Sequence, residues 1–166
     1  MKNHLLKFYR SWIYHFTDKR NIPEIIKNGG LMPRAMLNGI PFIPGGNQWS
    51  IDVDNSFGMD KYVHLCFLDD HPMEFLAREE GRIDPVWLKV STVVLDFPGV
   101  KYCAGVANQT NVKCLTATEA IKIMDFAHLF NWHDFSIEEN RNKHNEAKKY
   151  EILIPCKIPI ELIEGL

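Results

Sequence analysis

Residues 12–31, with the sequence WIYHFTDKRNIPEIIKNGGL, constrain the fold most, because they combine a strand and a short helix with clear ends. Tryptophan, isoleucine, tyrosine and phenylalanine suit a half-buried pleated surface, so residues 12–17 are predicted to form a strand. Asn21 is expected to cap the helix, with Glu24 in the capping-box position. Gly29 is expected to end it in the left-handed conformation. The polar residues at the end of the strand then lie beside the helix, which is a common way to build a site.

The composition indicates a folded globular protein of one domain, residues 1–166, with enough apolar residues for a core. The net charge of -2 at pH 7 excludes a general attraction to nucleic acid, so any such binding needs a local basic patch. No apolar run approaches the roughly 18 residues of a membrane span, and no signal-peptide pattern is seen. We therefore expect no membrane association and a cytoplasmic location.

The four cysteines have no CxxC or other paired metal spacing. Cys66 and Cys156 lie in apolar, strand-like runs, so both are expected to be buried reduced thiols. The seven histidines form no HExxH or related pattern, which argues against a catalytic metal. The common serine-hydrolase and nucleotide-binding motifs are also absent from the sequence.

Along the chain, helical signals cluster early, and strand signals cluster in the middle and at the end, which favours an α+β fold. Residues 32–47 are rich in proline and glycine and are expected to form a long loop of the kind that often acts as a lid. The predicted strands are residues 61–67, one or two strands within 86–97, and residues 100–105 and 150–155. A helix capped by Thr116 or Thr118 is expected to extend to about Leu129.

Glu151 is the strongest candidate for chemistry, because it is an acid inside an otherwise apolar strand, where an unpaired charge is costly. A cleft would explain it, and so would an edge or rim position. His15, between Tyr14 and Phe16, is by itself more typical of a satisfied structural histidine. His64 fits that interpretation better still, and His71 before Pro72 is expected to cap a turn.

In HFTDKRNIPEIIKNGGL, a His-x-Thr strand end is followed by Asn-aliphatic-Pro and a helix ending in Gly-Leu, and this pattern resembles the opening motif of the DarT-type ADP-ribosyltransferase family. KYVHLCFLDDHPM is similar to its second strand and Pro-Met turn, and KYEILIP to its glutamate-bearing strand near the C-terminus. The segments occur in the family's order and span nearly the whole chain.

The resemblance implies an ADP-ribosyltransferase-like split, mainly antiparallel β-sheet core with flanking helices, and NAD bound as co-substrate in the central cleft. It implies transfer of ADP-ribose to a base of single-stranded DNA by a toxin or phage-defence effector, restrained by a macrodomain-type antitoxin. Glu151 matches the catalytic glutamate, and His15 matches the histidine that holds the NAD ribose. The other matched positions of the NAD pocket are Thr17, Asn21, Gly30, Leu31 and Tyr62, with Phe67 as the alternative to Tyr62.

The segment before Glu151, residues 133–149, would face the nucleic acid in such an enzyme. Its basic residues are expected to contact phosphates, and aromatic side chains there are expected to stack on unpaired bases. The predicted phosphate contacts are Arg141, Lys143, Lys148 and Lys149, and the predicted stacking residues are Trp132 and Phe135.

The chain departs from the family pattern in two places. Members carry an arginine before the second segment, whereas residues 51–60 contain neither arginine nor lysine. Arg34, in the preceding loop, is the only arginine nearby, so either Arg34 takes the place of that arginine in the cofactor pocket or the chemistry is tuned differently. His64 stands where the family has proline or a small residue. These differences leave RNA as an alternative substrate, and also transfer to a protein or small molecule, NAD hydrolysis, or a degenerate module that binds without turnover. An RNA-processing phosphotransferase is disfavoured, since its usual basic pocket residues are not evident.

Overall fold

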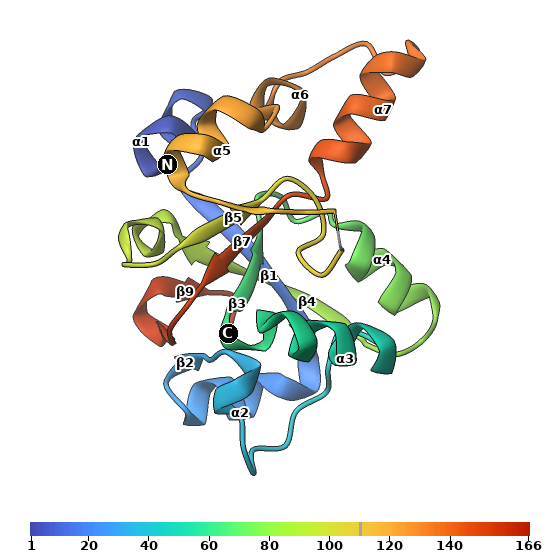
Figure 1. Cartoon of the computed structure of the whole chain (residues 1–166). Coiled ribbons are helices and arrows are strands. Elements are labelled where there is room, and N and C mark those ends of the chain that lie inside the picture. The colour runs from blue at the N-terminus through green and yellow to red at the C-terminus, as the bar shows by residue number, and fades with distance from the viewer. Residues whose placement is uncertain (110) are drawn as a thin grey trace.

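A computed structural model of the chain describes residues 1–109 and 111–166. An antiparallel sheet of seven strands crosses the molecule (Figure 1). In spatial order the strands are β6 (Cys114–Leu115), β5 (Lys101–Cys103), β7 (Glu151–Ile154), β3 (Val63–Cys66), β1 (Trp12–Asp18), β4 (Pro85–Ser91) and β9 (Ile163–Glu164). A second, two-stranded sheet pairs β2 (Gly30–Leu31) with β8 (Ile158–Pro159).

Helices flank the sheet, as expected for an α+β fold. They are α1 (Lys2–Leu5), α2 (Ile22–Lys27), α3 (Gln48–Phe57), α4 (Pro72–Glu79), α5 (Ala117–Ile123), α6 (Phe126–Phe130) and α7 (Glu138–Ala147). In Figure 1, α1, α5 and α6 gather at one end of the sheet, while α2 and α3 lie at the other end beside β2. The predicted antiparallel core and flanking helices are confirmed.

The sheet opens between its two central strands. β1 pairs with β4 along its whole length, from Trp12 opposite Ser91 to Asp18 opposite Pro85. β1 pairs with β3 at Tyr14, which lies opposite Cys66. His15 and the later residues of β1 lie beyond this pair. The second half of β1 therefore leaves β3, and side chains from both strands can face a cleft between them. This separation is the split that the resemblance predicted.

The core explains why the apolar runs became strands. Ile13, Leu65, Leu88, Ile152 and Ile154 are fully buried and belong to one hydrophobic cluster. They come from four adjacent strands, and burying such side chains stabilises the fold by about 1.5–3 kcal/mol each. Strand β7 is buried at every position, so Glu151 shares its strand with three fully buried aliphatic residues.

Several secondary-structure predictions were wrong in detail. Residues 51–60, for which no helix was predicted, lie in α3 and the 3₁₀ helix Met59–Lys61, because Asn47 caps α3 and Gly58 ends it. The region after β4 turns into a 3₁₀ helix, Thr92–Asp96. The helix capped by Thr116 does have a complete capping box with Glu119, but it stops at Ile123, and Asp125 caps α6 separately.

The cysteine prediction was right for Cys66 and wrong for Cys156. Cys66 is 5% exposed on β3, whereas Cys156 is exposed. Cys156 follows Pro155, after the last residue of β7, so it lies in the turn to β8 and outside the apolar strand. All four cysteines are free thiols.

Candidate active site

Two adjoining cavities occupy the opening between β1 and β3. The first has a volume of about 220 Å³ and the second of about 170 Å³. The residues that line both are His15, Phe16, Gly45, Gly46, Asp54 and His64. The cavities thus meet at the two histidines of the central strands, and a group bound in one can reach a group bound in the other.

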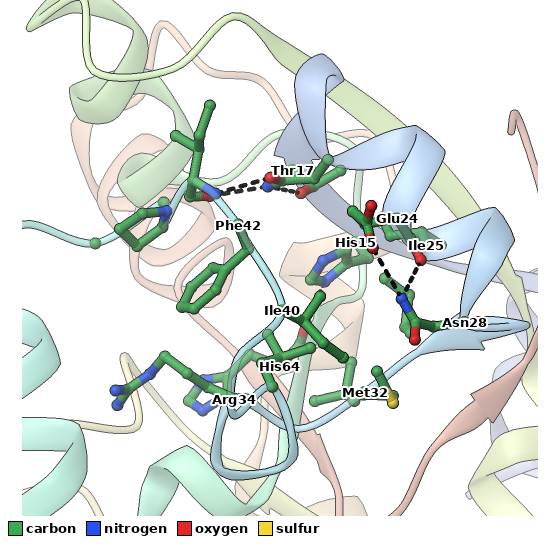
Figure 2. A pocket seen from close by; sticks show the side chains of 18 of the residues that line it. His15, Thr17, Glu24, Ile25, Asn28, Met32, Arg34, Ile40, Phe42 and His64 are labelled. Atoms are coloured by element: carbon green, nitrogen blue, oxygen red, sulfur yellow. Dashed lines mark hydrogen bonds between the residues drawn. The ribbon is translucent and has the colours of Figure 1, made fainter.

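The first cavity contains every residue that the sequence predicts for NAD binding. Its wall is formed by β1, α2, β2, the loop after β2 and the start of β3 (Figure 2). The predicted residues on this wall are His15, Thr17, Asn21, Gly30, Leu31, Arg34 and Tyr62. Phe67, the alternative to Tyr62, is 2% exposed, packs against Phe126, and lines neither cavity.

His15 bridges the opening in the sheet. Its Nδ1–H donates to the main-chain carbonyl of His64 over 2.9 Å, in place of a main-chain bond between the strands. Burial lowers the pKa of His15 to about 4 and outweighs the opposing effect of that hydrogen bond. His15 is therefore neutral, with Nδ1 protonated and Nε2 available as an acceptor for a hydroxyl group.

Asn21 has a different role from the predicted helix cap. It stands at the N-cap position of α2, but its side chain makes no capping bond. Its amide instead donates to Thr17 Oγ1 over 3.0 Å and to the Ile43 carbonyl over 2.8 Å, and its oxygen accepts from the Ile43 N–H over 2.7 Å. Asn21 thus ties the loop after β2 to the end of β1, and the predicted capping box with Glu24 was wrong.

Arg34 approaches the segment that lacks the family's arginine. Its Nη2 donates to the Ile51 carbonyl over 3.3 Å and lies 4.0 Å from Asp54 Oδ2, both on α3. Burial raises the pKa of Asp54, while His64 and Arg34 favour its charged form. Arg34 and Asp54 both line the first cavity. The loop after β2 therefore supplies a cation to this cavity, next to α3.

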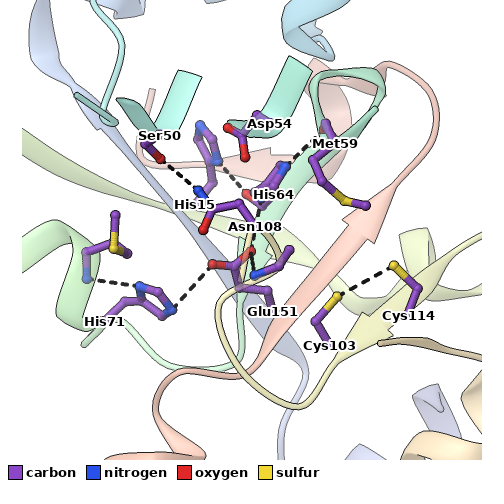
Figure 3. Close-up of polar contacts among 12 residues, drawn as sticks. His15, Ser50, Asp54, Met59, His64, His71, Cys103, Asn108, Cys114 and Glu151 are labelled. Carbon is purple, nitrogen blue, oxygen red and sulfur yellow. Dashed lines mark hydrogen bonds and ion pairs between the residues drawn. The ribbon is translucent and has the colours of Figure 1, made fainter. Parts of the chain in front are cut away.

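Glu151 lies at the start of β7, 6% exposed, and lines the second cavity (Figure 3). Its Oε2 lies 3.0 Å from His64 Nδ1 and accepts the Ala107 N–H over 3.4 Å. Burial acts to raise the pKa of Glu151, but His64, then His71 and Ala107, outweigh it and lower the pKa. Glu151 is therefore an ionised carboxylate in a nearly closed site.

His64 and His71 approach Glu151 from two sides, and the sequence analysis assigned neither to the site. His71 Nδ1 accepts the Met73 N–H at the start of α4, which confirms the predicted capping role. This fixes the proton on Nε2, which lies 3.8 Å from Glu151 Oε1. Neither histidine belongs to a sequence motif that would have identified it. His64 meets Glu151 because β3 pairs with β7 in the register that places Cys66 opposite Glu151.

Two further residues of the second cavity were also missed. Asn108 Nδ2 donates to Ser50 Oγ over 2.8 Å, and both side chains are buried. Ser50 belongs to α3, and Asn108 lies in a polar loop between β5 and β6 that resembles any other surface loop in the sequence. No local pattern could have identified them.

Comparison with known proteins agrees with this geometry. The profile of the family described as "ssDNA thymidine ADP-ribosyltransferase, DarT" matches residues 14–166. The chain belongs to the DarT family. No significant match was found among curated proteins. As a DarT-family member, the chain is an NAD-dependent ADP-ribosyltransferase that acts on single-stranded DNA, with NAD as co-substrate.

Solved DarT structures share the fold. Thermus sp. 2.9 DarT in complex with ADP-ribosylated ssDNA superposes with a TM-score of 0.69 at 18% identity, covering 93% of this chain and 79% of that one. The same Thermus protein in complex with NAD⁺ gives 0.64 at 17% identity, with the same coverage. Thermosipho africanus DarTG in complex with ADP-ribose gives 0.64 at 14% identity, covering 93% of this chain and 43% of that one.

The predicted DNA-contacting residues of this DarT-family chain lie on α7 and its flanks, outside both cavities. All three lysines are ion-paired within the chain, namely Lys143 with Glu139, Lys148 with Asp70 and Lys149 with Glu146. Arg141 donates to the Phe135 carbonyl, and Trp132 is 83% exposed. The segment thus presents an arginine and a tryptophan to solvent, and its lysines are offset by neighbouring acids.

No group of three metal-ligating side chains arranged to hold an ion occurs in residues 1–109 and 111–166. Over the same residues, no helix has the length and apolar character needed to cross a membrane.

Proposed function

We propose that this DarT-family chain transfers ADP-ribose from NAD to a thymine base of single-stranded DNA, with Glu151 as the catalytic carboxylate. The observation that carries this is the position of the ionised Glu151 in a cavity that adjoins, through His15 and His64, the cavity lined by every predicted NAD residue. NAD would occupy the first cavity and the acceptor base the second.

The chemistry follows from this arrangement. The bond between the ribose C1 and nicotinamide breaks, and nicotinamide leaves with the bonding electron pair. The ribosyl centre becomes oxocarbenium-like, and a nearby carboxylate stabilises that positive charge. The base nitrogen then forms the new bond to C1, and its proton passes to Glu151.

The NAD-binding roles follow from the first cavity. His15 Nε2 accepts a hydrogen bond from a ribose hydroxyl, and the ring of Tyr62 packs against nicotinamide. Thr17 and Asn21 shape the polar end of the pocket, and Arg34 supplies a cation for the pyrophosphate or for the reacting centre. Gly30 and Leu31 border the pocket where β2 meets β8.

On the DNA side, Trp132 is the stacking residue and Arg141 the leading phosphate contact. Lys143, Lys148 and Lys149 exchange their present partners for phosphates, since exposed ion pairs stabilise by only about 0–1 kcal/mol. Phe135, 38% exposed, is available beside them for a second base.

The biological setting that we propose is a toxin of a toxin–antitoxin or phage-defence system. Such an enzyme acts in the cytoplasm, where NAD and single-stranded DNA occur together. A macrodomain-type partner, which can bind ADP-ribose, would restrain or reverse the modification. The structural similarity to a DarTG protein supports this pairing.

The decisive experiment incubates the protein with NAD and matched thymidine-containing DNA and uridine-containing RNA oligonucleotides, and measures the mass of one added ADP-ribose. Glu151→Gln keeps the shape of the side chain and removes its charge, so transfer should fall by about 10²–10⁴-fold. The control is Glu79→Gln, an exposed acid on α4 that lines neither cavity.

Unimpaired transfer by Glu151→Gln would contradict the assignment of the catalytic residue. If only the RNA oligonucleotide is modified, the substrate is RNA and the proposal of a DNA substrate is wrong. NAD binding without any turnover would identify a degenerate module. Expression of the wild-type protein should also slow the growth of a bacterial host, and Glu151→Gln should relieve that effect.

A further inference from the structure

The ring of His64 lies between two acceptors. Its Nδ1 is 3.0 Å from Glu151 Oε2, and its Nε2 is 3.1 Å from the Met59 carbonyl oxygen. A carboxylate and a carbonyl can only accept, so each ring nitrogen must carry a hydrogen. The geometry therefore requires the doubly protonated, positively charged imidazolium.

The charged groups around His64 favour the same state. Glu151 approaches from β7 and Asp54 from α3, while neutral His15 on β1 donates a hydrogen bond only to the main-chain carbonyl of His64. Burial acts to lower the pKa of His64, but the hydrogen bond and charge of Glu151, with Asp54 and Met59, raise it to about 9. His71, on the far side of Glu151, is neutral, because burial lowers its pKa.

Glu151 depends on this partner. A carboxylate that is 6% exposed and lacks a cation tends to become protonated, because burial disfavours its charge. Without His64, its remaining hydrogen bond would be the one from Ala107 at 3.4 Å. A neutral Glu151 could neither stabilise a ribosyl cation nor accept a proton.

We propose that His64, on the wall shared by the two cavities, is a positioning residue that, as an imidazolium, fixes Oε2 of Glu151 and keeps this carboxylate of the second cavity ionised. Oε1 makes no hydrogen bond to any residue that the structure describes, and it stays free for the reacting groups. The proposal rests on the function proposed for Glu151. It also assigns a role to a histidine that departs from the family pattern.

A cation at this position has a second consequence. When Glu151 takes the proton of the acceptor base, the pair changes from neutral to a net positive charge. That charge lies on the wall shared by both cavities, where it favours the deprotonated, nucleophilic form of the base. Residues 51–60 lack arginine, and the imidazolium of His64 on β3 thus supplies a positive charge near this segment.

The pH dependence follows with a definite sign. His64 has a raised pKa, so its support of Glu151 is complete at neutral pH and is lost as the pH rises through about 9. Glu151 has a lowered pKa, so the wild-type rate should fall only at pH values below the ordinary range of a glutamate. Removing His64 should abolish the fall of the rate at alkaline pH and shift the fall of the rate at acidic pH to higher pH.

The test compares wild type with His64→Gln and His64→Ala in the DNA ADP-ribosylation assay. Misplacement of a catalytic group by about 1 Å costs about 10²-fold, and we expect kcat to fall by that amount in both variants. The KM for NAD should change little, because His15 bonds to the main chain of residue 64, which both variants keep. Imidazole added to His64→Ala should restore part of the rate.

A matched control is His4→Gln on α1, a histidine that lines neither cavity, which should keep the wild-type pH profile. Circular dichroism verifies folding, and His64→Gln serves if the alanine variant is unfolded. A ¹⁵N NMR titration of the imidazole nitrogens gives a readout independent of activity. It should show His64 doubly protonated at neutral pH in wild type, and with a lower pKa in Glu151→Gln.

Two results would overturn the proposal. One is a neutral His64 in the wild-type protein, and the other is a His64→Gln enzyme whose kcat is unchanged and whose rate falls at the same acidic pH as that of the wild type. A wild-type protein without transferase activity would instead contradict the proposed function itself. The two failures are therefore distinguishable.

Discussion

At the scale of single residues, the site depends on side chains whose hydrogen bonds cross between distant parts of the chain. Asn21 shows this most clearly, since its amide holds both the Ile43 main chain and the Thr17 hydroxyl. It is 8% exposed, so water cannot replace these bonds easily. The residue therefore couples the stability of the fold to the shape of the first cavity.

Replacing Asn21 with alanine tests this coupling. Leaving buried donors and acceptors unpaired costs about 1–3 kcal/mol, so the free energy of unfolding should fall by that amount and the KM for NAD should rise. Urea denaturation and initial rates measure the two effects. The control is Asn55→Ala, an exposed position on α3, and an equal response of both variants would contradict the role of Asn21.

At the scale of elements, the small sheet β2–β8 closes one end of the first cavity. Gly30 pairs with Pro159 there and has a φ of +132°, a conformation that L side chains rarely adopt. A Cβ at this position would lie 2.0 Å from the Ile158 carbonyl oxygen. The strand pair thus requires glycine for both conformational and steric reasons.

Gly30→Ala should therefore separate β2 from β8 and destabilise the protein by at least about 3 kcal/mol, at the upper end of single-site effects. Gly39→Ala provides the comparison, because Gly39 also has a positive φ, +75°, but open space around it. Its conformational cost alone is about 1–2 kcal/mol. Thermal unfolding compares the two, and similar losses would show that the steric contact with Ile158 is unimportant.

At the scale of the whole molecule, charge limits how DNA can be bound. The net charge is -2, and the three lysines of the predicted DNA-contacting segment already pair with acids. Association with DNA therefore depends on a few local contacts and on stacking.

The salt dependence of binding follows from this count. Arg141 and three lysines can neutralise at most four phosphates, so the slope of log Kobs against log salt for oligothymidylate should be no steeper than about −3. Fluorescence titrations between about 50 and 200 mM salt measure it. Trp132→Ala should weaken binding by about 1–3 kcal/mol without changing the slope. A much steeper slope would mean that another basic surface binds the strand.

Short-range patterns in the amino-acid sequence are sufficient to predict the local elements and the family. The strand and helix of residues 12–31, a helix capped at one of the two predicted threonines (Thr116) and the cap at His71 follow from short-range patterns, and all appear in the structure. Three short segments in order were enough to predict the split antiparallel sheet. The predicted NAD residues other than Arg34 could be found in this way because they lie within those segments.

The set of residues that share the site becomes apparent only in the folded structure. His64 and His71 look like isolated histidines in the sequence, and Asn21 looks like a helix cap. The pairing of β3 with β7 brings His64 to Glu151, which is 87 residues away along the chain. Burial there makes an unpaired charge costly, so the carboxylate and the imidazolium stabilise one another. Residues 12–31 provide one wall of the cleft, and the charge at its centre comes from strands that join it only when the chain folds.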